Sequence, residues 1–154
     1  GHHPTTMLCI RHLEAHPPRG LRVLDAGCGS GVLAFAALLL GAEAACGFDI
    51  DPEAIRVAGA NAARNGLEAE FRSGGPETFA GCRFDVILAN MLPRNFLPMV
   101  PALLALSRPG GGILFSGIGP EQRDEVREKL AGFPLDMEEE VSLGEWFAWR
   151  TRVK

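Results

Sequence analysis

A glycine-rich segment near the start of the chain is the strongest sign of chemistry in the sequence. It covers residues 25–31, with the letters D-A-G-C-G-S-G, and lies between an apolar run and an Ala- and Leu-rich stretch. Glycine lets the backbone turn sharply and approach a ligand without a Cβ atom in the way, and the helix that follows offers unpaired N–H groups. The segment therefore predicts a ligand-binding turn from a strand into a helix, although a purely structural turn would also use glycine.

A carboxylate follows at a distance typical of nucleotide sites. Asp49 ends the next apolar run, 22 residues after Gly27. An acid at this place in a nucleotide-binding fold accepts hydrogen bonds from the hydroxyls of a ribose. Asp49 could instead cap the helix expected from Pro52, but Asp51 is better placed for that role. We therefore expect Asp49 to be available for a ligand.

Alternating strands and helices must position these residues. Hydrophobic patterning predicts strands over 21–25, 44–49, 70–73, 84–90, 112–118, 136–141 and 145–153. Helices are expected over 5–15, 31–40, 52–65, 96–106 and 121–131. Strands separated by helices indicate βαβ units, and near-continuous apolar strands indicate burial on both faces.

The expected fold is therefore α/β, with a doubly wound, mostly parallel, seven-stranded Rossmann-like sheet. The last two strands have only a short link, 142–144, so they should form an antiparallel hairpin at one edge. Folds of this kind bind ligands at the carboxyl ends of the parallel strands. The glycine segment and Asp49 both fall at such ends.

Composition and charge fit one domain, expected over residues 1–154. Hydrophobic residues make up 47 % of the chain and charged residues 22 %, and the net charge is −4. A strongly basic face for nucleic acid is not expected from these values. Five arginines, Arg19, Arg22, Arg64, Arg72 and Arg83, are scattered along the chain. The mild acidity could attract a lysine-rich partner, although it also serves ordinary solubility.

The four cysteines predict neither a metal site nor a disulfide framework. No CxxC pair occurs, and no histidine cluster lies beside them at metal-ligand spacing. Free thiols are typical of a reducing compartment, so we expect the cytoplasm. The longest apolar run, 32–40, has nine residues and is too short to cross a bilayer. No signal peptide is visible, and no membrane partner is expected.

The spacing of the glycines discriminates between nucleotides. A dinucleotide fingerprint, G-x-G-x-x-G, would place its third glycine at position 32, where Val32 stands. The spacing present is G-x-G-x-G with an acid two residues ahead, which resembles the first motif of class I methyltransferases. That resemblance implies S-adenosylmethionine (SAM) as cofactor, with S-adenosylhomocysteine as its product. In such enzymes the loop passes the methionyl part of the cofactor.

A closer resemblance extends along nearly the whole chain. Six motifs occur in order: H-P-T-T at 3–6, the glycine loop at 25–31, D-I-D-P at 49–52, Asn61 with N-G at 65–66, A-N-M-L at 89–92, and S-G-I at 116–118. Together they resemble the PrmA family, bacterial methyltransferases of ribosomal protein L11. The first and fifth motifs are the specific ones, whereas the glycine loop is shared by all class I relatives.

The resemblance implies roles for five residues. Thr6 would lie in the segment that closes over the cofactor, and Gly27 and Gly29 in the loop that contacts it. Asp49 would bind the ribose, and Asn90 would lie beside the methionyl group and the transferring methyl. Family members also carry an upstream domain that recognises the ribosomal protein. That domain is expected to be missing from residues 1–154, since the chain opens within the first motif.

Methyl transfer needs mainly correct placement of the acceptor. The resemblance implies N-methylation of lysine side-chain and amino-terminal amines of a ribosomal protein, by a monomer. Asn90 is the candidate for positioning the amine, because its side-chain carbonyl can accept a hydrogen bond, while His3 is more simply an orienting or surface residue. Two alternatives remain: a non-catalytic SAM-binding module, and a small-molecule or RNA methyltransferase of the same fold.

Overall fold

The computed structural model describes residues 3–154. The helices are α1 (Pro4–Ala15), α2 (Val32–Leu39), α3 (Pro52–Arg64), α4 (Pro93–Phe96), α5 (Val100–Ala105) and α6 (Arg123–Ala131), with 3-10 turns η1 (Pro76–Phe79) and η2 (Leu97–Met99). The strands are β1 (Arg22–Ala26), β2 (Ala44–Asp49), β3 (Glu70–Ser73), β4 (Phe84–Asn90), β5 (Ser107–Ile118), β6 (Leu135–Leu143) and β7 (Trp146–Val153).

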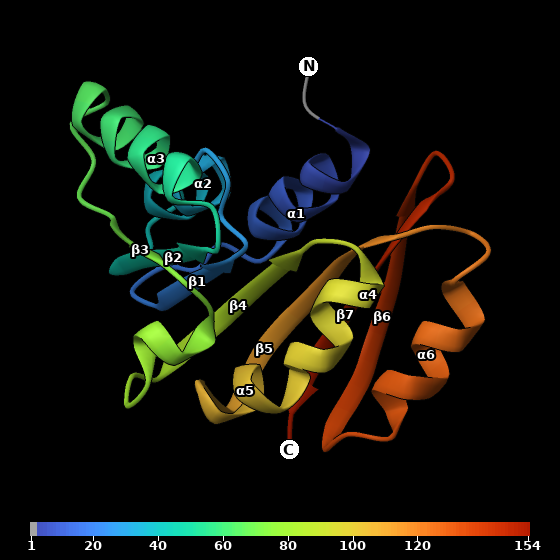
Figure 1. The fold of residues 1–154 in the computed structure, drawn as a ribbon. Coiled ribbons are helices and arrows are strands. Elements are labelled where there is room, and N and C mark those ends of the chain that lie inside the picture. The colour runs from blue at the N-terminus through green and yellow to red at the C-terminus, as the bar shows by residue number, and fades with distance from the viewer. Residues whose placement is uncertain (1–2) are drawn as a thin grey trace.

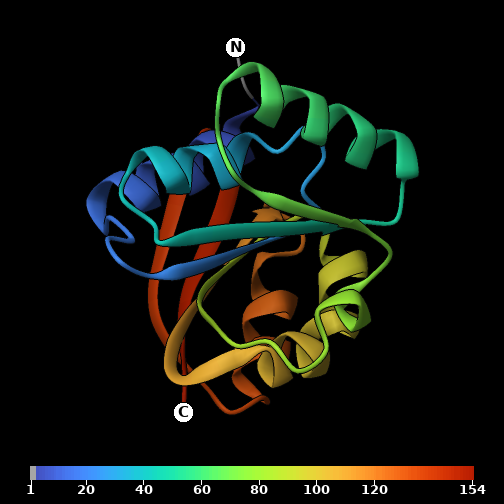
Figure 2. The ribbon, with the colours of Figure 1, turned by 90° about the vertical axis from the view of Figure 1, so that its left-hand side faces the viewer.

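The seven strands form one sheet in the order β3-β2-β1-β4-β5-β7-β6. Strands β1 to β5 pair in parallel, whereas β7 is antiparallel to both β5 and β6. Helices α1, α2 and α3 cover one face and α4, α5 and α6 the other, as Figures 1 and 2 show. The predicted doubly wound sheet with an antiparallel edge hairpin is therefore confirmed.

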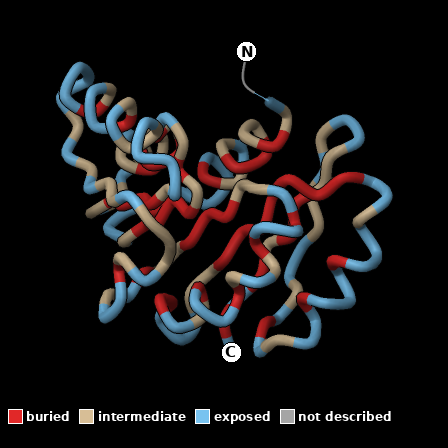
Figure 3. The backbone as a smooth tube through the Cα atoms, in the orientation of Figure 1, coloured by how far each residue is buried: buried red, intermediate tan, exposed pale blue. Residues whose placement is uncertain are grey.

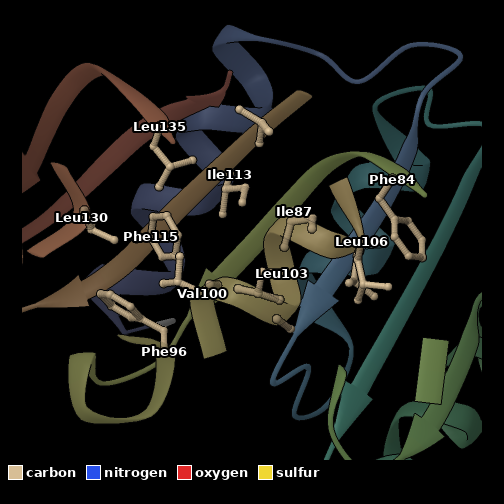
Figure 4. Packing of buried hydrophobic residues seen from close by; sticks show 14 of the residues in the cluster. Phe84, Ile87, Phe96, Val100, Leu103, Leu106, Ile113, Phe115, Leu130 and Leu135 are labelled. Atoms are coloured by element: carbon tan, nitrogen blue, oxygen red, sulfur yellow. The ribbon is translucent and has the colours of Figure 1, made fainter. Parts of the chain in front are cut away.

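Each face of the sheet has its own hydrophobic core, because successive side chains of a strand point to opposite faces. Ile87 packs towards α4 and α5 with Phe96, Val100 and other residues seen in Figure 4. Leu88, the next residue, packs towards α1 and α2 with Leu13. The strands are consequently buried along the middle of the molecule, and exposure is concentrated on the outer helices and loops (Figure 3).

The region predicted as a single helix over 96–106 is different in the structure. It consists of α4, η2 and α5 in succession, and each of these elements has a proline in its first positions. Proline has no N–H to donate and its ring clashes with the preceding turn, so a continuous α-helix cannot form through Pro98 and Pro101. The prediction of one helix was wrong here.

Strand β5 begins earlier than the predicted residue 112 and is interrupted near its start. Pairing with β4 moves from Ser107 opposite Phe84 to Gly112 opposite Val86, so residues 108–111 bulge out of the ladder. Gly110 has a φ of +79°, which favours glycine. The predicted strand over 112–118 is therefore the regular part of β5, and the bulge separates it from Ser107.

The described part of the chain contains neither a membrane-spanning helix nor a cluster of metal-binding side chains. In residues 3–154, no helix combines the length and the apolar character needed to cross a membrane. Over the same range, no three His, Cys, Asp or Glu side chains are grouped so that they could hold a metal ion. All four cysteines are free thiols, and Cys9, Cys28 and Cys46 are buried.

Candidate functional site

The glycine loop lies at the carboxyl end of β1, beside the end of β2. The backbone N–H groups of Gly27 and Cys28 both donate to the carbonyl oxygen of Phe48, at 2.9 Å each. Gly27 and Gly29 have φ angles of +72° and +51°, values that L-residues with a side chain rarely adopt. A Cβ atom added to Gly27 would lie 2.9 Å from the Met91 side chain, whereas one on Gly29 would meet nothing within 4 Å. The loop is thus fixed by its hydrogen bonds to Phe48 and by contact with Met91, while the space next to Gly29 is open.

Asp49 connects this loop to the start of α3. One carboxylate oxygen accepts from the N–H of Gly29 at 3.0 Å, and the other accepts from the N–H of Asp51 at 3.0 Å. Asp51 caps α3 by accepting from the N–H of Glu53 at 2.9 Å. Asp49 is therefore not the helix cap, and each of its oxygens keeps a lone pair for a further donor.

A hollow of about 440 Å³ opens between the ends of β2 and β4. Its lining residues come from the glycine loop, the end of β2 and the region around α4: Gly27, Phe48, Asp49, Ile50, Met91, Arg94, Asn95 and Met99. Ile50 is 82 % exposed although it is a large apolar side chain. A bare apolar side chain beside a polar carboxylate suits a ligand with a flat apolar part next to hydroxyl groups.

Asn90 and Thr6 meet at a second point of the same edge. The side-chain N–H of Asn90, the last residue of β4, donates to the Thr6 hydroxyl oxygen at 3.2 Å. The start of α1 is therefore held over the end of β4 (Figure 1). Among the described residues, the carbonyl oxygen of the Asn90 side chain has no hydrogen-bond partner. That oxygen is available to an external donor.

His3 acts locally on α1 in this structure. Its Nδ1 accepts from the Thr5 N–H at 3.2 Å and lies 2.8 Å from the Thr5 hydroxyl oxygen, so the ring caps the helix. The ring also packs edge-on against Trp146, with centroids 5.1 Å apart. These contacts match the orienting role considered from sequence rather than that of a general base.

The structure brings the five predicted residues to one edge of the sheet in two groups. Gly29 donates to Asp49 and Gly27 donates to the neighbouring Phe48, and Thr6 and Asn90 form the other group. Met91 lies between them, since it follows Asn90 and contacts the position where Gly27 would carry a Cβ. The geometry places these residues together, and their individual roles stay predictions.

Asp25, the first residue of the glycine-rich segment, is a buried acid. It is 1 % exposed, and one of its carboxylate oxygens has no hydrogen-bond partner among the described residues. Burial raises the pKa of this carboxyl to about 7, a donor from the Ala34 backbone opposes the shift, and the negative charge of Asp49 adds to it. The sequence analysis included Asp25 in the glycine-rich motif but assigned it no role of its own.

Sequence reasoning also missed Ile50 and Met91 as parts of the hollow. The available signal for Ile50 was a large apolar residue between two acids in D-I-D-P, a place where the chain leaves the sheet. Met91 directly follows Asn90, so a site assigned to Asn90 could have included its neighbour. Arg94 gave no signal, because its place beside the hollow depends on the proline-started turn of α4.

Comparison with known proteins decides the family. The family model described as ribosomal protein L11 methyltransferase (PrmA) matches residues 1–154. The chain belongs to this family. Relatives named ribosomal protein L11 methyltransferase from Pseudomonas aeruginosa and Azotobacter vinelandii are 49 % and 47 % identical to it over 138 and 133 residues. These alignments cover 88 % and 86 % of this chain but 47 % and 46 % of the relatives, so the chain spans about half the length of those PrmA-family proteins.

Solved structures agree with the family and the fold. A ribosomal protein L11 methylase from Lactobacillus delbrueckii subsp. bulgaricus matches with a TM-score of 0.90 and 31 % identity, over 97 % of this chain and 79 % of that chain. An RNA methyltransferase from Salinibacter ruber, solved in complex with S-adenosyl-L-homocysteine, matches with a TM-score of 0.75 at 20 % identity, over 96 % of this chain and 90 % of that chain. The second likeness shows the methyltransferase fold alone.

Proposed function

We propose that the protein containing this chain is a SAM-dependent methyltransferase that methylates lysine side-chain and amino-terminal amines of a ribosomal protein. Membership of the PrmA family supports the reaction and the class of acceptor. The observation on which the proposal mainly rests is the cradle itself: an open glycine loop joined to Asp49 next to a side-chain carbonyl of Asn90 that has no protein partner. S-adenosylhomocysteine is the product left after transfer.

The residues at this edge fit the proposed cofactor. The open front of Gly29 and the hollow beside Asp49 provide space, and Ile50 provides an apolar surface for a purine. The Asp49 carboxylate can accept from ribose hydroxyls while it holds the loop. When bound, the cofactor supplies an electrophilic methyl group on a positively charged sulfur. The negative charge of Asp49 beside the hollow is favourable for a positively charged ligand.

Asn90 is proposed to position the acceptor amine. One of its two side-chain N–H donors is used by Thr6, and its carbonyl oxygen has no partner among the described residues, so that oxygen can accept from an incoming donor. An amide carbonyl can hold an amine through an N–H but is not a base at neutral pH. A lysine must therefore lose its proton to solvent, at a cost of about 4–5 kcal/mol at pH 7 unless the site lowers its pKa. Placement by Thr6 and Asn90 then contributes orientation rather than proton transfer.

Further features of the whole protein are part of the same proposal. We propose that it acts in the cytoplasm as a monomer, with a separate upstream domain that recognises the ribosomal protein. The free thiols are compatible with a reducing compartment. A separate recognition domain agrees with a chain that covers about half of its relatives. Direct binding of nucleic acid or of a membrane is not part of the proposal.

Labelling in a lysate tests the proposed function. The natural full-length protein and isotope-labelled SAM are added to a lysate of cells that lack this enzyme, and modified products are identified by mass spectrometry. We expect label on lysine and amino-terminal amines of one large-subunit ribosomal protein. Label on RNA or on small molecules would contradict the proposed acceptor. SAM binding by calorimetry without any labelled product would identify a non-catalytic binding module.

A further inference from the structure

A buried serine lies beside the proposed acceptor site and has no role in the proposal so far. Ser116 is near the end of β5 and is fully buried. Its hydroxyl donates to the backbone carbonyl oxygen of Thr5, at 3.0 Å. The two residues are 111 positions apart in the sequence, so this contact connects the first turn of α1 to β5, a strand in the middle of the sheet. A buried hydroxyl is costly unless it is hydrogen-bonded, which makes the contact persistent.

Ser116 and Asn90 are neighbours across the sheet. In the parallel ladder of β4 and β5, Asn90 is paired with Ser116, and the Met91 N–H donates to the Ser116 carbonyl oxygen at 3.2 Å. The two side chains contact consecutive residues of α1, Thr5 for Ser116 and Thr6 for Asn90. Two adjacent strands thus hold one helical turn by two adjacent residues.

We propose that Ser116 is a positioning residue for methyl transfer, acting through Thr5 and Thr6 on the orientation of the Asn90 amide. This inference rests on the proposed function. The Ser116 hydroxyl sets how closely the first turn of α1 approaches the sheet. At that distance the Thr6 hydroxyl engages the Asn90 N–H, and the Asn90 carbonyl oxygen remains free for the acceptor amine.

The orientation of the Asn90 amide depends on its single contact with Thr6. Rotation about the last side-chain bond of asparagine has a broad, roughly two-fold preference, so the bond alone does not fix which end faces the ligand. The contact with Thr6 is already 3.2 Å long, and a small outward movement of α1 would break it. Because a hydroxyl can accept as well as donate, the contact fixes the position of the amide, and its loss would leave the amide free to rotate away from the acceptor amine.

The chain contains a matched control at the other end of the same strand. Ser107, the first residue of β5, is also buried, and its hydroxyl also donates to a helix carbonyl oxygen, that of Leu103 at 2.8 Å. Removing either hydroxyl deletes a buried hydrogen bond to a helix carbonyl oxygen, and the Ser116 hydroxyl also interacts with the Cys9 thiol of α1. Only Ser116 lies next to Asn90, so a general loss of stability and a loss of positioning can be separated.

The main experiment compares Ser116→Ala with Ser107→Ala in the natural full-length protein, acting on its ribosomal protein at saturating SAM. We expect kcat to fall about 3–10-fold in Ser116→Ala, as for the loss of one oriented hydrogen bond, and to change less than about twofold in Ser107→Ala. The dissociation constant of SAM should change less than about twofold in both. Equal kcat in the two variants would overturn the proposal.

A double-mutant comparison tests the route through Thr6. Thr6→Val removes the hydroxyl that engages Asn90 and lies at a less buried position than Ser116. We expect it to lower kcat as much as Ser116→Ala does, with little further loss when the two are combined. Additive losses would show that Ser116 acts independently of Thr6 and would overturn the proposed route. Should Ser116→Ala fail to fold, Ser116→Cys replaces the hydroxyl with a weak thiol donor and is compared with Ser107→Cys by the same criteria.

A readout besides activity is the NMR signal of the Asn90 side-chain amide, assigned by its loss in Asn90→Asp. We expect the signal to move in Ser116→Ala and in Thr6→Val and to stay in place in Ser107→Ala. An unmoved signal in Thr6→Val and Ser116→Ala would refute the positioning role. If the signal moves but the wild-type protein methylates no acceptor, the positioning contact stands and the proposed function fails.

Discussion

The sheet has one hollow at the carboxyl ends of its parallel strands, called here the carboxyl edge, and another at their amino ends, the amino edge. The two hollows have almost the same size but differ in how their polar groups are paired. At the carboxyl edge, about 440 Å³ opens between the ends of β2 and β4. At the amino edge, a hollow of about 420 Å³ is lined by α1, the β5 bulge and β7. Volume therefore does not distinguish a ligand site from a surface depression here. The pairing of the polar groups does.

At the amino edge, charged side chains bind one another. Asp85 accepts from the Arg22 backbone N–H at 2.9 Å and from the Arg108 guanidinium at 3.1 Å. Arg152 donates to Glu138 at 3.0 Å and to the carbonyl oxygen of Gly110 at 2.9 Å. Arg150 has a buried Nε without a hydrogen bond, but this atom lies 3.7 Å from a Glu138 oxygen. These partners leave little capacity for a ligand.

At the carboxyl edge, polar capacity is left over. One Asp25 oxygen is buried without a partner, and the Asn90 carbonyl is unused among the described residues. Glycines with positive φ angles occur at both edges, for example Gly27 and Gly29 here and Gly20 and Gly110 at the amino edge, so they do not distinguish the two. Unmet hydrogen bonds of buried groups are rare, and they concentrate at functional sites. The comparison can be tested by making matched substitutions at the two edges and measuring their effects.

The largest expected effect is the loss of stability caused by Gly117→Ala, at the glycine of β5 that contacts Met91. Gly117 has a φ of +102°, and an added Cβ would lie 2.5 Å from the Met91 carbonyl oxygen. Gly117→Ala should lower the free energy of unfolding by about 3–4 kcal/mol, from backbone strain and overpacking. Gly20→Ala at the amino edge, with a φ of +72° and open space around it, should cost about 1 kcal/mol. Urea unfolding measures both, and equal losses would contradict a specially strained carboxyl edge.

Acidity should stabilise the ligand-free protein through Asp25. Burial raises the folded-state pKa from 3.8 to about 7, so the proton stabilises the folded state and that contribution is lost as pH rises through 7. Between pH 5 and pH 8 the free energy of unfolding should fall by roughly 3 kcal/mol from this group. Asp25→Asn should remove that part of the slope. A wild-type slope that Asp25→Asn leaves unchanged would disprove the buried-acid explanation.

Binding of SAM should depend on Asp49 at the carboxyl edge and not on Asp85 at the amino edge. Asp49→Ala removes a charge-assisted acceptor and should weaken SAM binding by about 10–100-fold, corresponding to about 1.5–3 kcal/mol. Asp85→Ala removes an aspartate that also bridges two donors, at the amino edge, and should leave SAM affinity within about twofold. Calorimetry with both variants tests the ribose assignment, which unchanged affinity in Asp49→Ala would defeat.

The smallest expected effect separates turnover from cofactor binding at Asn90. Asn90→Ala should lower kcat about tenfold and weaken SAM binding less than about threefold, because the amide is proposed to hold the acceptor. Asn65→Ala, at the far end of α3, should change neither quantity. Steady-state rates and calorimetry provide the two values. Equal losses in both would make Asn90 a cofactor contact, and no loss would make it a structural residue.

Local patterns predicted most of the sheet and the main parts of the site. Each strand has its own apolar run, and the glycine loop and Asp49 stand at strand ends, which in parallel sheets lie on one edge. The helix over 96–106 was mispredicted because its apolar pattern was given more weight than Pro98 and Pro101. Prolines at the start of short elements can be seen in sequence, so this error was avoidable.

Other features could not be predicted, because they arise from contacts between distant segments. The hydrogen bond from Ser116 to Thr5 and that from Asn90 to Thr6 join residues 111 and 84 positions apart. The missing partner of the Asp25 oxygen is a property of everything packed around it. No periodicity or motif specifies such geometry, even when the participating residues are already known.

The position of α1 also has a consequence for the order of folding during synthesis. Its apolar face, with Leu8, Cys9 and Leu13, packs on Leu114 of β5 and Ala148 of β7. A chain emerges from the ribosome with its N-terminus first, so α1 appears long before these strands. Val23 of β1, Leu33 of α2 and Leu88 of β4 belong to the same cluster and are made earlier, so they can cover part of this face before β5 and β7 emerge. The complete native surface for α1 exists only after β7 has been made, and until then part of the apolar face is open to chaperones or to aggregation.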